Sequence, residues 1–306
     1  EQCERMISAK KQGFSSLRKP LALQLNSLED EYAPILLKGG EVLFFTARRP
    51  ETTGENLNPD DSKYFEDMYR ANWNPITMDY EMDYEFFKSI NTNGFDALSF
   101  VNKEGTYALL TVNTAYTEKT TKSSDLFELY SDEPFDWSSP TVLKGKGLNT
   151  DYFEGSATLA EGGENGAFMV FTSDRRADVS GLDLFSTIKS DLGFGPIIPL
   201  PKEINSEGNE TTPFITSDGK FLFFSSDELP GFGGYDIFYS MFENGSWSTP
   251  VNLGPEINSV NDDTHFNIDL SAKKACFASM AEKDGYYSYD LFQADLSTAA
   301  YPFIVK

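Results

Sequence analysis

The strongest constraint on this fold is a set of short motifs that recurs five times along the chain. An Asn followed by Ser or Thr opens each repeat, and the spacings between these Asn residues are 65, 58, 56 and 53. A carboxylate follows five residues after each Asn, and an Asp-aliphatic-aromatic triplet comes later in each repeat. The Asn residues are Asn26, Asn91, Asn149, Asn205 and Asn258; the carboxylates are Glu31, Asp96, Glu154, Glu210 and Asp263; the triplets begin at Asp67, Asp125, Asp183, Asp236 and Asp290. Five copies of one module therefore make up the chain.

Each module predicts four short strands. In the fourth, apolar runs at 211–216, 221–227, 235–242 and 247–254 are separated by Gly-, Asp- and Asn-containing turns, and helical periodicity is nearly absent. Repeats of four strands are typical of propeller blades packed face to face around an axis. We therefore predict an all-β, five-bladed propeller of four-stranded antiparallel blades. A sixth blade is the alternative, if the long first repeat conceals a degenerate one.

The two ends of the chain predict how the ring closes. Residues 19–26 resemble the outer strand of the fourth repeat at 249–258, whereas the fifth repeat ends in the irregular stretch 296–306. We expect the N-terminal strand to complete the last blade, so that residues 19–306 form a single propeller domain. Residues 1–18 are expected to be a linker with a short helix, the remnant of a helical-repeat domain.

Charge and composition exclude several functions. The 48 acidic and 25 basic side chains give a net charge of −23, which disfavours binding to nucleic acid or to anionic lipid. An aromatic content of 14% indicates a folded chain with a large core. No apolar run is long enough to be a transmembrane span. Cys3 and Cys276 do not make a disulfide framework, and Cys276 lies in an apolar run that predicts burial.

The repeated carboxylates are predicted to be structural. The triplet Asp residues follow Gly- or Ser-rich loops, where a carboxylate accepts backbone N–H bonds. The acids five residues after each Asn fall near one mouth of the axial channel, where we expect them to bind backbone N–H groups and hold the spacing between blades. The alternative for this ring is a Ca²⁺ or Mg²⁺ site, or a docking rim for a basic tail. No other cofactor is expected.

One acidic segment does not belong to the repeated motifs. Residues 79–86 alternate acid and apolar side chains, which predicts a half-buried strand with one face formed by Asp79, Glu81, Asp83 and Glu85. Such charges protect an exposed sheet edge from aggregation. A ridge that binds a basic partner is the alternative. The nearby acidic insertion at 50–66 is a further candidate contact element.

Catalytic motifs are scarce. His265 is the single histidine, on an expected inner strand beside Phe266, and a structural role is favoured for it. The chain contains neither a Gly-x-Ser-x-Gly elbow nor a His-Glu-x-x-His motif. Paired carboxylates for glycoside hydrolysis stay possible, because many acids surround the expected channel.

Three strings of the fourth repeat carry a resemblance to a known family. Residues 217–227, 231–240 and 247–254 resemble the TolB-type, WD-like propeller repeat, as found in Bacteroidetes envelope proteins of the OmpA family and in PorE-like components of the type IX secretion system. The resemblance covers nearly the whole chain. The C-terminal peptidoglycan-binding domain of that family is absent here, so peptidoglycan binding is not carried over.

The resemblance implies a non-catalytic protein-interaction scaffold, in the periplasm or at the outer membrane, with other cell-envelope proteins as partners and a place in type IX secretion. The main alternative is a carbohydrate-binding or glycoside-processing propeller with an acidic axial site. A metal-dependent sensor built on the acidic ring is a third.

Overall fold

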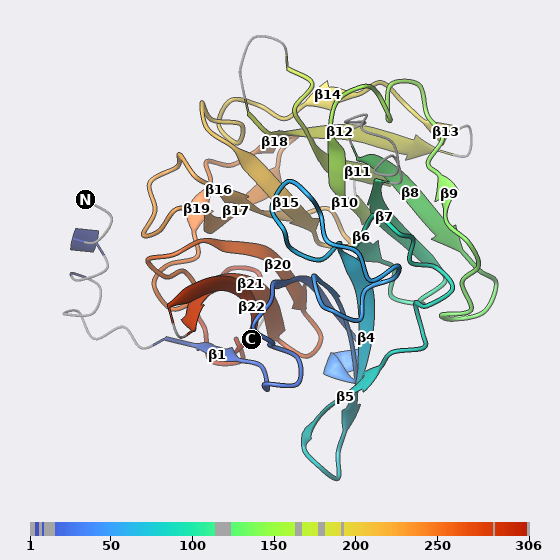
Figure 1. Cartoon of the computed structure of the whole chain (residues 1–306). Helices are drawn as coiled ribbons and strands as arrows, with labels where there is room; N and C mark the ends of the chain where they lie inside the picture. Colours follow the sequence, from blue (N-terminus) through green and yellow to red (C-terminus); the bar gives the residue numbers. More distant parts are fainter. Residues whose placement is uncertain are drawn as a thin grey trace.

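The computed structural model describes residues 4–5, 8, 16–113, 124–162, 167–176, 181–190, 193–283 and 285–304, and these form five antiparallel sheets arranged around one axis (Figure 1). Each sheet is one blade, and in each the chain runs from an inner strand outward. Blade 1 holds β2 (Glu31–Leu37), β3 (Val42–Ala47), β4 (Asp67–Asn74) and β5 (Asp79–Asp83), with a short 3-10 helix η1 (Lys38–Gly40); blade 2 holds β6 (Phe95–Val101), β7 (Tyr107–Asn113), β8 (Asp125–Tyr130) and β9 (Thr141–Val142).

The other three blades repeat this order. Blade 3 holds β10 (Glu154–Ala160), β11 (Phe168–Ser173), β12 (Asp183–Ser190), β13 (Gly193–Phe194) and β14 (Ile198–Pro199); blade 4 holds β15 (Glu210–Ile215), β16 (Phe221–Ser226), β17 (Asp236–Glu243), β18 (Ser246–Trp247) and β19 (Val251–Asn252); blade 5 holds β20 (Asp263–Asp269), β21 (Lys274–Lys283) and β22 (Tyr286–Asp295), completed by β1 (Arg18–Pro20). In blades 3 and 4 two short segments pair with the third strand and together form the outer strand. The predicted five-bladed, all-β architecture is confirmed, and the first repeat forms a single blade.

Closure of the ring follows the sequence prediction. β1 pairs antiparallel with β22, so that Arg18 lies opposite Ala294 and Pro20 opposite Phe292. The Arg18 guanidinium reaches back into the blade and donates to Asp263 Oδ1 at 2.8 Å. Because the first strand belongs to the last blade, opening the ring would break this ladder and expose the apolar face beneath it.

The repeated Asn ties the end of each blade to the next repeat. The Asn side chain binds the backbone of the residue that follows the triplet Asp. Its Oδ1 accepts the N–H of that residue, and its Nδ2 donates to the C=O of the same residue. The pairs are Asn91 with Met68, Asn149 with Leu126, Asn205 with Leu184, Asn258 with Ile237 and Asn26 with Leu291. The first four pairs span 21 to 23 residues, whereas the last joins the two ends of the chain. The same side chain therefore performs the same task in all five blades, including the closing one.

Every inner strand carries a bulge that faces the axis. The register with the second strand shifts within each inner strand, and in four blades the bulged residue has a positive φ: Ala33, Ser156, Thr212 and His265. This backbone region costs a non-glycine residue on the order of 1 kcal/mol or more. Two of these N–H groups bond to the neighbouring blade: His265 N–H to Thr212 Oγ1 at 3.1 Å and Ser156 N–H to Thr111 Oγ1 at 2.9 Å. The bulges thus link adjacent blades around the axis.

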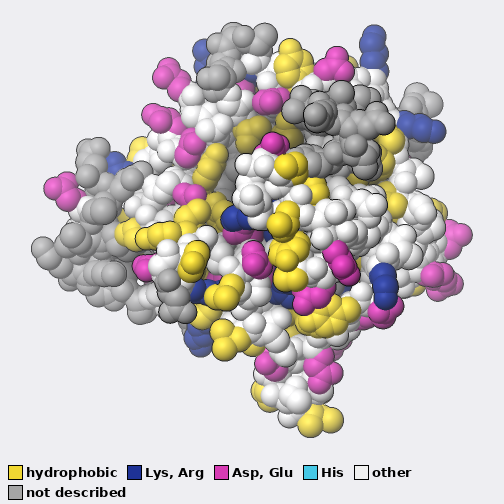
Figure 2. Space-filling view, viewed as in Figure 1, with side chains coloured by type: hydrophobic (Ala, Val, Ile, Leu, Met, Phe, Trp, Pro, Cys, Tyr) yellow, Lys and Arg dark blue, Asp and Glu magenta, His cyan; other side chains and the backbone are white. Residues whose placement is uncertain are grey.

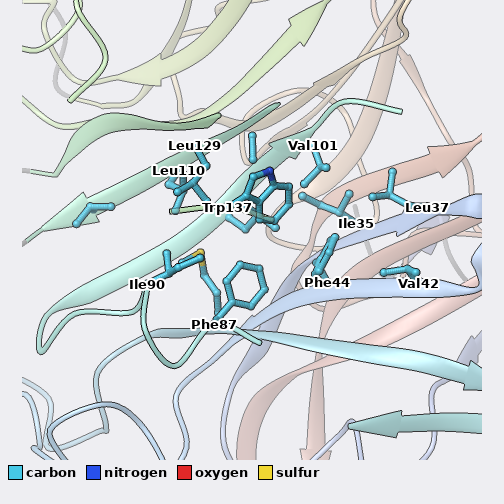
Figure 3. Packing of buried hydrophobic residues seen from close by; sticks show 14 residues of the cluster. Ile35, Leu37, Val42, Phe44, Phe87, Ile90, Val101, Leu110, Leu129 and Trp137 are labelled. Carbon is cyan, nitrogen blue, oxygen red and sulfur yellow. The ribbon is translucent and has the colours of Figure 1, made fainter. Parts of the chain in front are cut away.

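The core lies between blades. Figure 3 shows the cluster between blades 1 and 2, where Phe44 and Trp137 have ring centroids 5.8 Å apart and Phe87 packs on the same rings. Burying a side chain of this size contributes about 1.5–3 kcal/mol. Cys276 is buried within another such cluster, as predicted.

One local prediction was wrong, and another lies outside the described residues. The strand expected over 79–86 ends at Asp83, because Phe86 and Phe87 turn into the cluster between blades 1 and 2. The short helix expected within residues 1–18 falls almost wholly on positions outside the described residues, so it stays a prediction.

Candidate functional site

The five ring acids stand at the starts of the inner strands, and none of them lines either cavity of the axis described below. Each is fully buried. In every blade the carboxylate accepts the backbone N–H of the Ser or Thr that follows the repeated Asn, over 2.5 to 2.9 Å: Glu31 from Ser27, Asp96 from Thr92, Glu154 from Thr150, Glu210 from Ser206 and Asp263 from Ser259. These acids brace the loop that enters each blade, and their burial leaves no open ring of carboxylates for a cation or a tail.

In three blades an arginine completes this arrangement. Arg49 bonds Glu31, Arg175 bonds Glu154 and Arg18 bonds Asp263, at 2.9, 2.7 and 2.8 Å. Each guanidinium also stacks over two aromatic rings of its blade. Blades 2 and 4 show no such cation among the described residues. Burial therefore raises the pKa of Asp96 to about 7, although Thr92 donates two hydrogen bonds to it.

The triplet acids begin or lie within the third strands and are also engaged. Asp67 accepts from Thr53 N–H at 2.7 Å, and Asp236 from the N–H groups of Phe232 and Gly233. Asp183 pairs with Arg176, and Asp290 pairs with Lys283. Asp125 begins β8, after a segment that lies outside the described residues.

The acidic ridge lies far out on blade 1 and does not join the axial acids. Asp79, Glu81 and Asp83 belong to β5, the outermost strand of the blade. Glu85 follows the strand and pairs with Lys88 at 2.9 Å. Figure 1 shows the β4–β5 hairpin projecting from the ring, and Figure 2 shows hydrophobic side chains at its tip.

One end of the axis is covered by the insertion between β3 and β4. In Figure 1 this segment lies over the centre of the ring, and Figure 2 shows side chains filling that centre. Arg48 binds Asp61 through two hydrogen bonds of 2.7 and 3.0 Å, and Lys63 pairs with Asp30 at 2.5 Å. These contacts hold the insertion against the ring, so this end of the axis is closed.

Below the insertion the axis holds a small cavity of about 50 Å³, enough for one or two water molecules. The four bulge residues with positive φ line it, and His265 is among them. Burial lowers the pKa of His265 to about 3, so its imidazole is neutral at physiological pH. This agrees with the structural role predicted for the single histidine, and the cavity is too small for a sugar ring.

At the other end the axis widens into a cavity of about 480 Å³. The turns and strand ends that follow the five inner strands form its wall, and they bring charged side chains from four blades together: Lys38, Lys103, Glu161 and Asp269. The two cavities share the wall residues Ile35, Ser99, Phe214 and Asn267, so they lie next to each other along the axis. A cavity of this volume is within the range of small-ligand sites.

The two carboxyl groups of the wide cavity are in different electrostatic environments. Partial burial raises the pKa of Glu161, and the nearby charge of Glu104 adds to this. Burial also disfavours the charged form of Asp269, but hydrogen bonds from Ser271, Ala272 and Gly39 outweigh it and lower the pKa. Two carboxyls whose pKa values are pushed apart can act as an acid and a base in one site.

Sequence reasoning did not find this pair. It looked for the axial acids at the start of each inner strand, whereas the open cavity lies at the end of the inner strands. The available signal was positional: Lys38, Lys103, Glu161 and Asp269 all stand where an inner strand gives way to its first turn. Among the residues that the structure describes, no group of three or more His, Cys, Asp or Glu is placed to hold a metal ion.

Comparison with solved structures supports the fold over nearly the whole chain. A glycoside hydrolase matches with a TM-score of 0.59 and 9% identity, covering 95% of this chain and 94% of its own. The endo-arabinase of Bacteroides thetaiotaomicron matches with a TM-score of 0.52 and 15% identity, covering 87% and 94%. An arabinanase of Bacillus subtilis matches with a TM-score of 0.52 and 12% identity, covering 88% and 94%. No protein-family model and no curated protein matches the chain.

These comparisons correct the functional expectation drawn from the sequence. The three solved structures described above are a glycoside hydrolase, an endo-arabinase and an arabinanase, and none of these is a TolB-type or PorE-like envelope protein. This overturns the assignment to a TolB-type repeat family, the non-catalytic interaction scaffold, the place in type IX secretion and the expectation that the chain is not an enzyme. At these identities the likeness is one of fold. Within the described part of the chain, no helix has the length and apolarity to cross a membrane.

Proposed function

We propose that the protein binds a carbohydrate in the wide axial cavity and hydrolyses a glycosidic bond there. The observation that carries the proposal is the pair Glu161 and Asp269, two carboxyls that line one cavity and have pKa values displaced in opposite directions. Glycoside hydrolysis requires one carboxyl that is protonated and one that is ionised. The five-bladed fold shared with glycoside hydrolases supports the same reading.

The two carboxyls have distinct roles in this reaction. Glu161, with the raised pKa, donates its proton to the oxygen that leaves the scissile bond. Asp269 stays ionised and either accepts a proton from the attacking water or attacks the anomeric carbon itself. Its Oδ2 accepts one hydrogen bond, from Gly39 N–H at 2.9 Å, whereas Oδ1 accepts bonds from Ser271 and Ala272. Oδ2 therefore keeps a free lone pair for this work.

The turn that carries Asp269 is held rigidly. The three residues that donate its four hydrogen bonds belong to two blades, since Gly39 is in blade 1 and Ser271 and Ala272 follow the inner strand of blade 5. The carboxylate is thus fixed across the junction of the first and last blades. A base fixed in this way needs little reorganisation when the substrate enters.

Hydrolysis of oligosaccharides tests the proposal. We expect release of reducing sugar from at least one member of a panel of arabinan, xylan, galactan and pectin oligosaccharides, and a loss of 10²-fold or more in kcat for Glu161→Gln and Asp269→Asn. Lys220→Gln is the matched control, because Lys220 lies in the corresponding turn of blade 4 but does not line the cavity. Melting temperatures of all variants show whether they fold. Folded variants with unchanged turnover would overturn the acid and base assignment.

The pH profile gives a second readout. Activity should fall on the acid side as Asp269 is protonated, at a pKa below its usual 3.8, and on the alkaline side as Glu161 ionises, at a pKa above its usual 4.5. Glu161→Gln should abolish the alkaline limb of the pH profile.

We further propose that the protein works in the periplasm or at the outer membrane, where polymeric glycans are accessible. Fractionation of cells checks this location.

A further inference from the structure

The wide cavity has an uneven distribution of charge that the proposed hydrolysis does not use. Blades 1 and 2 contribute Lys38 and Lys103, whereas blades 3 and 5 contribute Glu161 and Asp269. The cations are thus on adjacent blades and the carboxyls on the others. From this arrangement we propose that the substrate is an acidic carbohydrate, whose sugar carboxylate binds at the lysine side while the glycosidic bond lies toward the carboxyl side. This inference rests on the proposed function and specifies its substrate class.

Lys38 is placed at the cavity wall by its backbone and by one aromatic contact. It follows β2 and has a φ of 52°, the left-handed region that a long side chain rarely adopts. Its Nζ lies 4.7 Å from the centre of the Phe135 ring, which comes from blade 2. An ammonium over an aromatic face keeps part of its hydration and its full charge, because the ring supplies no opposite charge. Lys38 therefore bridges blades 1 and 2 and keeps its charge at the edge of the cavity.

Lys103 stands at the same place in blade 2. It belongs to a tight turn in which Asn102 accepts the N–H groups of Thr106 and Tyr107, both within 3.0 Å. Asn102 is also a hydrogen-bond partner of Glu161 in the neighbouring blade. The turn that carries the cation is therefore joined to the group proposed as the acid. A sugar held by Lys103 would be positioned relative to that acid.

Among the described residues, neither lysine forms an ion pair. Lys63, Lys88 and Lys283, by contrast, each have a carboxylate within 3 Å. In a chain with a net charge of −23, Lys38 and Lys103 line the same cavity. Because the surrounding field repels anions, recognition of a carboxylate needs a local cation of this kind.

The charge balance of the cavity agrees with an anionic ligand. Four hydrogen bonds spread the charge of Asp269, and the raised pKa of Glu161 favours its neutral form. The charges of Glu104 and Lys189 also act on Glu161 and are opposite in sign. A uronic acid would place its carboxylate beside Lys38 and Lys103, whereas a neutral sugar would offer these two cations no opposite charge.

Calorimetric titration with matched oligosaccharides tests the inference. The probes are a galacturonic acid tetrasaccharide, its fully methyl-esterified form and a neutral galactose tetrasaccharide, with a glutamate tetrapeptide to separate a sugar acid from any polyanion. We expect the uronic acid form to bind about tenfold more tightly than its methyl ester, which has the same rings without the charge. Lys103→Gln and Lys38→Gln should each remove most of this preference and leave binding of the ester unchanged, whereas Lys220→Gln should bind like the wild type.

The outcomes separate the inference from the proposal on which it rests. Binding of the neutral and esterified probes as tight as that of the acid, or a preference unaffected by both lysine variants, would refute the acidic substrate and leave hydrolysis of neutral glycans standing. Equal binding of the glutamate peptide would show a general anion site and would also refute it. A folded protein that binds none of the sugar probes would count against both.

Discussion

Replacing Asp96 by Asn should make the protein more stable at alkaline pH and leave it unchanged in acid. Asp96 is fully buried in blade 2, where one oxygen accepts two hydrogen bonds from Thr92 and Oδ1 has no partner among the described residues. Burial raises its pKa from 3.8 to about 7. The folded state therefore holds a proton that the unfolded chain loses, and the free energy of unfolding falls as pH rises from 3.8 through 7.

The size of this loss follows from the shift. A difference of about 3 pH units, at 1.4 kcal/mol for each unit, corresponds to roughly 4 kcal/mol above pH 7. This is an upper estimate, because water reaching the ionised group would reduce it. Asn keeps the acceptor for Thr92 and cannot ionise, so Asp96→Asn avoids the loss. The stability gained by the variant should be near zero at pH 4 and largest at pH 8 to 9.

Urea unfolding of both proteins at pH 4, 5, 6, 7 and 8 measures this difference. Other buried carboxyls, among them Glu210 and Asp236, also have raised pKa values, but they are common to both proteins and cancel in the difference. A difference that stays constant across this range would show that Asp96 does not change its proton binding on folding. The account of the ring acids as buried structural groups would then be wrong for blade 2.

Three further changes probe the blades. Glu154→Gln leaves Arg175 without its carboxylate and should cost about 3–5 kcal/mol at pH 7 in urea unfolding, opposite in sign to the change at Asp96. Arg18→Ala removes the guanidinium that binds buried Asp263 and joins β1 to blade 5, and a loss of similar size is expected, with faster proteolysis of the N-terminal strand. Phe44→Ala should cost about 3–5 kcal/mol, because it empties the cluster between blades 1 and 2. Losses below 1 kcal/mol in these variants would contradict the contacts described.

The sequence was sufficient for the architecture because each blade repeats the same local chemistry. Asn26 and Asn258 share a motif, and this shared motif predicted that the chain ends meet in one blade. For the ring acids the sequence predicted bonds to backbone N–H groups but not which groups donate them. The Ser or Thr after each Asn was the available signal, because its N–H donates to the carboxylate in every blade.

The open cavity could not be read from the sequence, because it depends on how blades assemble. Lys38 and Asp269 are 231 residues apart and meet only when the ring closes. Nor does a linear pattern show that Arg48 and Asp61 hold the insertion over the other end of the axis. The resemblance of the fourth repeat to a secretion-associated family reflected the strand and turn chemistry of a propeller repeat, which carries no information about the site on the axis.

The most direct test of the account is a crystal structure of the Glu161→Gln variant soaked with the oligosaccharide that the wild type hydrolyses fastest. We predict density for a sugar chain in the wide cavity, with the residue at position 161 near the oxygen of the scissile bond and Asp269 on the opposite side of the ring. A sugar bound at the insertion-covered end of the axis, or outside the channel, would contradict the proposal.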